Sequence, residues 1–432
     1  MKKHLFATAV LAMMMSTISA QHGKYVGGDI SDLPLYEQHN SPYLDANGNK
    51  IQDLITWLTQ ECEWNTFRVR LFVNPNGRTN DDMKVDPSVA QDLEYVKALG
   101  KRIKEAGANF LLDFHYSDTW VDAGHIQAPA AWKNMSVEEK SAQISTYTKN
   151  CLDELISAGA KPDMVQVGNE IMYGFMGIKV APYETSGCNW DGFLSVLKSG
   201  CDAVREACPE AKIIVHTDRP SNGDYANYWY GKLDKAKIDY DIIGLSYYPF
   251  WHGTLNDLKK GLDNLKTKFP NKSVQIVETG YYFQYWPTSG INYNTQATWP
   301  ASTTGQYNFV RDLIKTLADY EQVEGLYYWC PEDAGNGDDT DWKTSSGTVM
   351  TDWTNRGLWN PNTSSTGHKI NSCASGNVPM LMKKFLGENG DQSIAQIVTE
   401  NIDTPQFNLL GQRKKSPRKG EIFIQNGKKV IK

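Results

Sequence analysis

Two glutamates, Glu170 and Glu278, each follow a short apolar run. Residues 164–167 lead through a glycine and Asn169 to Glu170, and residues 274–277 lead directly to Glu278. Short apolar runs bounded by turn residues are typical of strands covered on both faces. Either glutamate alone is equally well explained as a solvated strand end. The pair, separated by two further strand–helix units, indicates two carboxyl groups that face each other across the mouth of a barrel.

Two facing carboxyl groups meet the chemical requirement for hydrolysing a glycosidic bond. One must be held protonated to give a proton to the leaving oxygen, and the other must stay ionised to attack the anomeric carbon. Desolvation and a neighbouring negative charge raise the pKa of the acid, while hydrogen bonds and a nearby arginine keep the nucleophile ionised. We therefore expect Glu170 to be the acid/base, Glu278 the nucleophile, and Asn169 a partner of the sugar 2-hydroxyl. A carboxyl separation of about 5–5.5 Å would give retention of configuration.

Further polar and aromatic side chains are predicted at other strand ends. Arg68 and Arg70 alternate along one strand, so they either face the barrel interior and orient the site carboxylates or are ordinary solvated arginines. Trp and Tyr present flat apolar faces with a polar edge, and sugar rings stack on such faces. Besides Asn169, the predicted substrate-binding residues are Asp29, Arg68, Arg70, His115, Asp118, Trp120, His216, Asp218, Tyr247, Trp251 and Trp329.

Eight apolar runs have the spacing of strands in an α/β protein, near residues 25, 66, 109, 164, 212, 242, 274 and 325. Most are followed by apolar residues at three- and four-residue steps, which predict helices. Asp86-Pro87 predicts the start of a helix over residues 89–106, and a capping box at residues 136–139 predicts the start of the next. Eight strands alternating with helices predict an α/β (β/α)8 TIM barrel. An open doubly wound sheet is the alternative, but no GxGxxG motif follows the first strand.

The two ends of the chain differ in composition from the barrel. Residues 1–20 combine a basic start, an apolar run too short to span a bilayer and small residues before the expected cleavage after Ala20. This pattern predicts a signal peptide and an exported protein, in the periplasm, on the cell surface or outside the cell. The catalytic barrel is predicted over residues 21–386, a linker over 387–406 and a basic tail over 407–432. An Asn-Gly pair predicts a small hairpin in the tail, with contact to nucleic acid or membrane as the alternative.

Composition excludes several classes of partner. A net charge of −6 over 432 residues gives no nucleic-acid footprint over the body of the chain, and no other segment is apolar enough to span a membrane. An odd count of seven cysteines leaves at least one unpaired. The sequence does not decide whether Cys330 and Cys373 form a disulfide. We predict no cofactor and no metal. The acidic loop from Asp333 to Asp341 offers oxygen ligands for Ca²⁺, but it lacks a full EF-hand pattern.

Six motifs follow one another along the chain: Gly28-Asp29-Ile30-Ser31-Asp32-Leu33-Pro34, Phe67-Arg68-Val69-Arg70-Leu71, Asp113-Phe114-His115-Tyr116-Ser117-Asp118-Thr119-Trp120, Gln166-Val167-Gly168-Asn169-Glu170, Gly244-Leu245-Ser246-Tyr247-Tyr248-Pro249 and Val277-Glu278-Thr279. In sequence and in order they resemble glycoside hydrolase family 53, the endo-β-1,4-galactanases that act on arabinogalactan. The resemblance implies a retaining barrel enzyme with its acid/base at Glu170 and its nucleophile at Glu278. It also implies the substrate, internal β-1,4-galactosidic bonds in the (arabino)galactan side chains of pectin. We expect a monomer.

Two alternative functions stay open. A retaining barrel hydrolase for another β-glycan, such as a mannanase or β-glucanase, would use the same two glutamates. A galactan-binding protein with little or no activity would need neither a proton donor nor a nucleophile, and this chain has both. Some family members carry an Asp-rich calcium loop after the nucleophile strand, but residues 281–286 lack its acids. The basic tail lies outside the family and is similar to C-terminal segments of some exported bacterial proteins, which suggests sorting or a surface role.

Overall fold

The structure is a computed structural model that describes residues 23–38, 42–77, 86–181, 185–221, 223–284, 298–334, 354–360 and 367–387, with the backbone of four short strands beyond residue 405. The predicted signal peptide and most of the predicted linker lie outside these residues. The chain forms two compact units, one ending at Leu386 and one beginning at Gly387.

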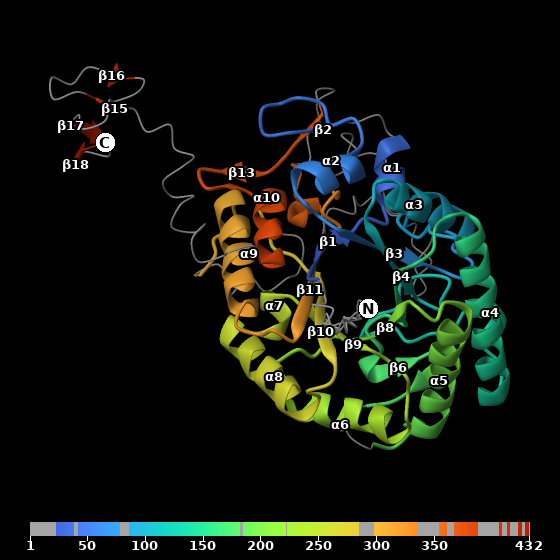
Figure 1. The fold of residues 1–432 in the computed structure, drawn as a ribbon. Helices are drawn as coiled ribbons and strands as arrows, with labels where there is room; N and C mark the ends of the chain where they lie inside the picture. Colours follow the sequence, from blue (N-terminus) through green and yellow to red (C-terminus); the bar gives the residue numbers. More distant parts are fainter. Residues whose placement is uncertain are drawn as a thin grey trace, which may run out of the picture. The chain divides into compact units, whose positions relative to one another are not determined.

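Eight parallel strands close into a barrel in the first unit (Figure 1). Each strand pairs with the next one along the chain, and the last pairs back to the first. Parallel neighbours need a crossover connection, which the helices provide. The predicted (β/α)8 barrel is therefore confirmed. In chain order the barrel strands are β1 (Tyr25–Asp29), β3 (Thr66–Leu71), β4 (Asn109–Phe114), β5 (Met164–Val167), β8 (Lys212–Thr217), β9 (Ile242–Tyr247), β10 (Ser273–Thr279) and β11 (Val323–Trp329).

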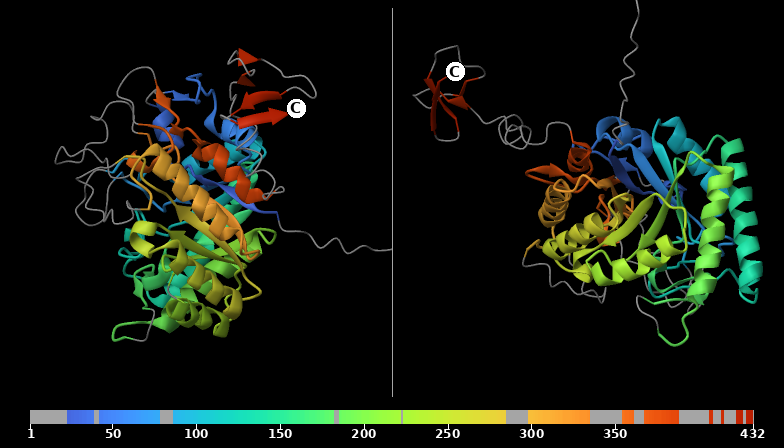
Figure 2. Two further views of the ribbon diagram at one scale, coloured as in Figure 1. Left: turned by 90° about the vertical axis from the view of Figure 1, so that its left-hand side faces the viewer. Right: turned by 60° about the horizontal axis from the view of Figure 1, so that its bottom comes forward.

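The described chain has six long helices. They lie outside the strands and surround the barrel (Figures 1 and 2). They are α3 (Leu93–Glu105), α4 (Val137–Ser157), α5 (Trp190–Ala207), α6 (Gly223–Lys235), α8 (Leu255–Lys268) and α9 (Thr303–Leu317). Shorter helices and strands lie in the connections between these elements. The helical ones are α1 (Leu33–Gln38), α2 (Leu54–Glu61), α7 (Pro249–His252) and α10 (Val378–Met382), with 3₁₀ turns at Ala130–Trp132, Ile171–Tyr173, Thr354–Arg356 and Lys383–Leu386. The paired short strands are β2 (Tyr43–Leu44) with β12 (His368–Lys369), β6 (Gly174–Phe175) with β7 (Ile178–Lys179), and β13 (Ser372–Cys373) with β14 (Gly376–Asn377).

The predicted helix starts have opposite outcomes. The capping box is confirmed, because Ser136 and Glu139 bond each other's backbone N–H at the start of α4. The start at Asp86-Pro87 is wrong, since α3 begins at Leu93 with Asp92 as its N-cap. Asp86 instead accepts the backbone N–H of Ser88 at 3.1 Å, a local bond that competes with helix formation.

Helix α6 was not predicted from the sequence. Its buried residues Ala226, Trp229, Tyr230 and Leu233 lie at three- and four-residue steps, which is the helical signal. Aromatic and glycine residues with low helix propensity surround that pattern and weaken it. Tertiary packing of the apolar face therefore decides this element rather than local preference.

The barrel interior is apolar in one layer and polar in the next. Six inward side chains form an apolar cluster, made by Leu111, Met164, Ile214, Ile242, Val277 and Tyr327. Residues two apart on a strand share a face. The next inward positions on three of these strands are Asp113, Gln166 and His216, so polar groups begin one layer nearer the carboxyl ends.

The second unit contains a four-stranded antiparallel sheet. Its strands are β15 (Gln406–Phe407), β16 (Arg413–Lys414), β17 (Ile422–Gln425) and β18 (Lys428–Ile431), in the order β16, β15, β17, β18. The pairing of β17 with β18 confirms the predicted hairpin.

Two further observations concern the whole described chain. Among its helices, none combines the length and the apolar character needed to cross a membrane. All seven cysteines are free thiols, so the Cys330–Cys373 disulfide considered from the sequence does not form.

Candidate active site

A cavity of about 610 Å³ opens among the loops that follow the carboxyl ends of the barrel strands. This volume is typical of a small-molecule pocket. In a (β/α)8 barrel these strand ends are where active sites lie. Carboxyl groups and aromatic rings dominate the walls. The described lining residues are Asp32, Tyr36, Asp86, Ser88, Trp120, Val121, Asp122, Ala123, Asn169, Glu170, Asp218, Arg219, Tyr248, Trp251, His252, Glu278, Trp329, Cys330 and Asp333.

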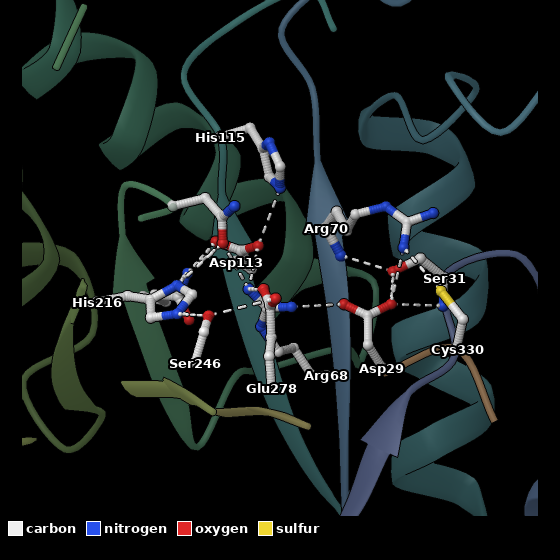
Figure 3. A network of polar contacts seen from close by, with 12 residues as sticks. Asp29, Ser31, Arg68, Arg70, Asp113, His115, His216, Ser246, Glu278 and Cys330 are labelled. Carbon is white, nitrogen blue, oxygen red and sulfur yellow. Dashed lines mark hydrogen bonds and ion pairs between the residues drawn. The ribbon is translucent and has the colours of Figure 1, made fainter. Parts of the chain in front are cut away.

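Two fully buried arginines lie beneath the cavity and organise its carboxylates (Figure 3). Arg68 contacts Asp29 at 2.9 Å, Asp113 at 2.8 Å and Glu278 at 3.1 Å. Arg70 contacts the other oxygen of Asp29 at 3.0 Å. Of the two orientations that the sequence left open, both arginines have the inward one, and neither is solvated. Each buried guanidinium is stabilised because it is paired with carboxylates.

Glu278 lies at the end of β10 and is 5% exposed. Its Oε1 contacts Arg68, and its Oε2 accepts hydrogen bonds from Tyr248 Oη at 3.1 Å and Ser246 Oγ at 3.4 Å. Burial raises the pKa of Glu278 to about 7, and the charge of Arg68 opposes the rise. These contacts stabilise the ionised form of Glu278. Its pKa is therefore lower than that of a carboxyl group buried without them.

A β-bulge gives Glu278 its inward direction. Val277, the preceding residue, belongs to the interior apolar cluster, so strict alternation would turn Glu278 outward. The register of β10 against β9 skips one residue between Ile276 and Glu278. Bulges of this kind re-aim a side chain next to active sites.

Glu170 follows β5 after a sharp backbone turn. Gly168 has φ +86°, and Glu170 itself has φ +45° in the left-handed region. Glu170 Oε1 accepts a 2.6 Å hydrogen bond from Ser246 Oγ, and Oε2 accepts the backbone N–H of Ala123 at 3.4 Å. A non-glycine residue in this conformation is held there by its surroundings, and such strain is common at functional sites.

The pKa of Glu170 is raised well above its ordinary value. Burial is the main cause, and the charges of Glu278 and Asp218 add to it. Glu170 is therefore the member of the pair that keeps its proton to higher pH. The arrangement provides one carboxyl group suited to donate a proton beside one suited to attack.

Ser246 fixes an upper limit to the distance between the two glutamates. Its hydroxyl oxygen is 2.6 Å from Glu170 Oε1 and 3.4 Å from Glu278 Oε2. These two carboxylate oxygens are therefore at most 6.0 Å apart. Carboxyl groups about 5–5.5 Å apart suit a covalent double displacement, whereas roughly 6.5–9.5 Å leaves room for a water molecule in between.

A buried hydrogen-bonded chain supports Asn169 and Glu170 from below. Asn169 Oδ1 accepts from Arg68 at 2.8 Å, and its Nδ2 donates to the carbonyl of Val121 at 2.9 Å. His216 lies 3.0 Å from Asn169 Oδ1 and 2.8 Å from Ser246 Oγ. Burial, followed by the charge of Arg68, lowers the pKa of His216 well below its ordinary value, so this imidazole is neutral.

Aromatic rings supply the apolar part of the walls. Trp329 lies over both buried arginines, with ring-centre distances of 5.5 Å to Arg68 and 5.3 Å to Arg70. Trp120 lies 4.5 Å from Arg70 and donates its Nε1–H to Asp86 at 2.8 Å. Trp251 is 50% exposed, an unusual state for a tryptophan that lines a cavity. Such rings are suited to stack on sugar faces.

The predicted binding residues divide into three groups. Trp120, Asn169, Asp218, Trp251 and Trp329 line the cavity. A second group lies buried around or beneath it, and consists of Asp29, Arg68, Arg70, His115 and His216.

Two predicted binding residues lie elsewhere. Asp118 accepts the backbone N–H of Ala130 at 2.8 Å, so it fastens a loop. Tyr247 points outward, where it stacks on Phe309 of α9 and donates to the carbonyl of Gly253. Neither residue is among those that line the cavity.

Several residues of the site were not predicted from the sequence. Ser246 and Tyr248 share the inward face of β9 and its extension, and both bond Glu278. Both lie at alternate positions from Ile242, so they can be found by counting along β9 once the inward face of this strand is known. Asp32 bonds Arg70 at 2.6 Å and lines the cavity, but only the three-dimensional arrangement brings it there.

One described cluster has the composition of a metal site. Ligand atoms of Asp32, Cys330 and Glu332 lie within 4.8 Å of one another. Asp32 is already paired with the guanidinium of Arg70 at 2.6 Å, which supplies positive charge to this cluster. The loop considered for Ca²⁺ from the sequence begins at Asp333, and beyond Ala334 it lies outside the described residues.

A barrel whose strand ends carry two close carboxyl groups, flanked by aromatic rings, has the site of a glycoside hydrolase. The chain belongs to glycosyl hydrolase family 53, whose model matches residues 25–367. It is thus a hydrolase of glycosidic bonds, as the motifs predicted.

Known proteins agree with this assignment. An endo-beta-1,4-galactanase of Bacillus subtilis strain 168 is 31% identical over 76% of this chain and 75% of that protein. An arabinogalactan endo-beta-1,4-galactanase of Thermothelomyces thermophilus is 32% identical over 71% of this chain and 89% of that protein. The GH53 catalytic domain of Ignisphaera aggregans superposes with a TM-score of 0.70 at 27% identity, covering 85% of this chain and 97% of that one.

Proposed function

We propose that this protein is an exported, retaining endo-β-1,4-galactanase that cleaves internal β-1,4-galactosidic bonds in (arabino)galactan side chains of pectin. The limit of 6.0 Å between carboxylate oxygens of Glu170 and Glu278 carries the proposal of a retaining reaction. The named galactanases of the family support the substrate.

In the first step Glu278 attacks the anomeric carbon while Glu170 gives its proton to the leaving glycosidic oxygen. Arg68 and Tyr248 hold the carboxylate of Glu278 through its two oxygens, so the nucleophile is oriented before substrate arrives. The C–O bond to the leaving sugar breaks as the bond to Glu278 forms. The products are a galactosyl ester of Glu278 and a shortened chain with a free hydroxyl.

In the second step a water molecule takes the place of the departed sugar. Glu170, now ionised, accepts a proton from the water while the water oxygen attacks the anomeric carbon. The ester bond breaks and Glu278 regains its charge. Ser246 bonds both carboxyl groups and holds them in position while Glu170 changes from acid to base. Two inversions give net retention.

Several wall residues are proposed to hold the sugar chain. Trp120, Trp251 and Trp329 offer faces on which galactosyl rings stack. Asn169 borders the cavity next to Glu170, where it contacts the 2-hydroxyl of the unit under attack. Asp29 and Arg68 are positioning residues beneath them, because they orient the groups that touch the substrate.

Release of reducing ends tests the activity. The protein from Gln21 onward is incubated with linear β-1,4-galactan, with β-mannan and β-glucan as controls. We expect rapid release of short galacto-oligosaccharides from galactan alone. Cleavage of only another glycan would keep the glycosidase and reject the substrate, whereas no cleavage of any would favour a galactan-binding protein.

The retaining mechanism has its own test. A 2-fluoro-galactosyl donor with a good leaving group should form a stable ester on Glu278, detected by mass spectrometry of the peptide that carries this residue. The Glu278→Gln variant is the matched control and should stay unlabelled. A first-formed product with inverted anomeric configuration would reject double displacement.

Export and independence from a bound cofactor are further parts of the proposal. The predicted signal peptide at residues 1–20 supports export, and N-terminal sequencing of the mature protein should begin at Gln21. Every step above uses side chains of this chain alone. We therefore expect a monomer by light scattering and full activity after treatment with EDTA; loss of activity restored by Ca²⁺ would contradict this.

A further inference from the structure

The cavity is lined by an excess of carboxyl groups. Seven of its nineteen described lining residues carry one. Apart from the two catalytic glutamates, these are Asp32, Asp86, Asp122, Asp218 and Asp333. They come from several connections around the barrel, so negative charge surrounds the cavity rather than marking one edge of it.

Positive charge at the described cavity wall comes from Arg219. The Nε of Arg219 lies 3.5 Å from Asp218, and its guanidinium lies 5.5 Å from the ring of Tyr173. His252 also lines the cavity, but burial lowers its pKa to about 3 and leaves it neutral. Carboxylates therefore outnumber cations among the described groups that a substrate meets.

The buried arginines do not reverse this excess. Arg68 and Arg70 are fully buried beneath the floor and are not among the lining residues. Between them they pair with Asp29, Asp113, Glu278 and Asp32, four carboxylates for two guanidinium groups.

Neighbouring carboxylates influence one another's protonation. Burial raises the pKa of Asp218 against the effect of Arg219, and the charge of Asp122 adds to the rise. Burial likewise raises the pKa of Asp32 against the effect of Arg70, with Asp29 and Asp86 adding to it. A further anion placed in the cavity would meet the same field, which a low-dielectric, partly enclosed site concentrates.

We propose that the cavity selects neutral galactosyl units, with Asp86, Asp122 and Asp218 as specificity-determining residues that exclude uronate units. This inference rests on the proposed galactanase function. Neutral sugars donate hydroxyl hydrogens, which carboxylates accept, whereas the carboxylate of a uronate offers acceptors alone. A uronate therefore adds charge repulsion and loses the hydrogen bond that the corresponding hydroxyl makes. Cleavage next to a uronate is therefore expected to be slower than cleavage next to galactose.

A charge-altered galactan tests the inference. Linear β-1,4-galactan is oxidised at a small fraction of its C6 positions to the aldehyde and then divided. One half is oxidised on to the carboxylate, and the other half is reduced back to galactan as a matched control. Initial rates at low concentration give relative kcat/KM, and mass spectrometry places each uronate relative to the new chain ends.

We expect the reduced-back chain to be cleaved like untreated galactan. Cleavage next to a uronate should be at least about tenfold slower than next to galactose. Raising NaCl from about 0.05 to 0.5 M should narrow this difference, because salt screens the repulsion. A steric block would leave the difference unchanged by salt and would overturn the proposal.

Asp122→Asn removes one wall charge and nearly preserves its shape. We expect the rate on the oxidised chain, relative to that on the neutral chain, to rise at least about twofold. The control is Asp202→Asn, which removes an exposed carboxylate on α5 that pairs with Lys198. Equal cleavage beside uronate and galactose by the unaltered enzyme would reject the inference. No cleavage of the neutral chain would reject the proposed function instead.

Discussion

At the scale of single residues, the two glutamates are distinguished by their neighbours. Burial raises the pKa of both. The guanidinium of Arg68 opposes the rise at Glu278, while the charges of Glu278 and Asp218 add to the rise at Glu170. As pH increases, Glu278 therefore ionises first and Glu170 retains its proton. The active form of the pair exists between these two ionisations.

The pH profile of kcat/KM should reflect this order. Activity should fall on the acid side as the pH drops through about 7, because Glu278 becomes protonated there. On the alkaline side it should fall when Glu170 loses its proton. In Asp218→Asn the alkaline limb should move to lower pH, since a charge that raises the pKa of Glu170 has been removed. An unchanged alkaline limb in a folded variant would contradict this role, and Asp202→Asn is the control.

Removal of the acid/base group should be repairable by an added anion. For Glu170→Ala we expect turnover of galactan to fall by about 10²–10⁴-fold, because no group protonates the leaving oxygen or activates water. With an aryl galactoside whose leaving group needs no proton, azide should restore turnover and give a galactosyl azide. In Glu278→Ala, any turnover that azide restores should give a product of inverted configuration, not a retained one. An inverted azide from Glu170→Ala together with a retained azide from Glu278→Ala would reverse the two roles.

At the scale of elements, alternation along the strands explains both the successes and the errors of sequence reasoning. Strand order and the two strand-terminal glutamates follow from apolar runs. Inward and outward faces do not, because every residue of β9 is buried whichever face it occupies. Tyr247 was assigned to the site for that reason, whereas its neighbour Tyr248 occupies it. The bulge at Glu278 likewise cannot be predicted from the sequence, because it depends on the register of β10 against β9.

The turn after β5 provides a prediction for an element. Gly168 has φ +86°, and a Cβ there would lie 2.7 Å from Ile171 Cγ2 and 2.9 Å from Phe175 Cε2. Gly168→Ala should lower the free energy of unfolding by roughly 2 kcal/mol or more and reduce turnover, because Glu170 is displaced with the turn. Thermal unfolding and kcat check both effects.

Gly231→Ala is the matched control for Gly168→Ala. Gly231 lies in α6, where an added Cβ meets nothing within 4 Å. Alanine is favoured over glycine inside a helix by about 1 kcal/mol, so this variant should unfold at the same or a higher temperature and keep its turnover. Loss of stability in both variants alike would show that glycine as such, rather than the turn, is required.

At the scale of the whole molecule, the proposed catalytic groups all belong to the first unit. Its last elements are anchored to the barrel: Met382 and Phe385 are buried, and the carbonyl of Pro379 accepts a hydrogen bond from Trp64 at 3.0 Å. The second unit begins at Gly387, directly after these contacts. A chain ending at Leu386 would therefore retain every contact described for the cavity.

Removal of residues 387–432 should accordingly leave catalysis unchanged and alter where the protein accumulates. We expect kcat/KM on galactan within about twofold of the full chain and an unchanged thermal transition of the barrel, because its packing is intact. If the basic tail serves in sorting, as its resemblance to exported bacterial segments suggests, the shortened protein should accumulate at a different location in the producing cell. Comparison of activity in cell-bound and medium fractions measures this. A large loss of kcat/KM with normal folding would instead place the tail in substrate binding.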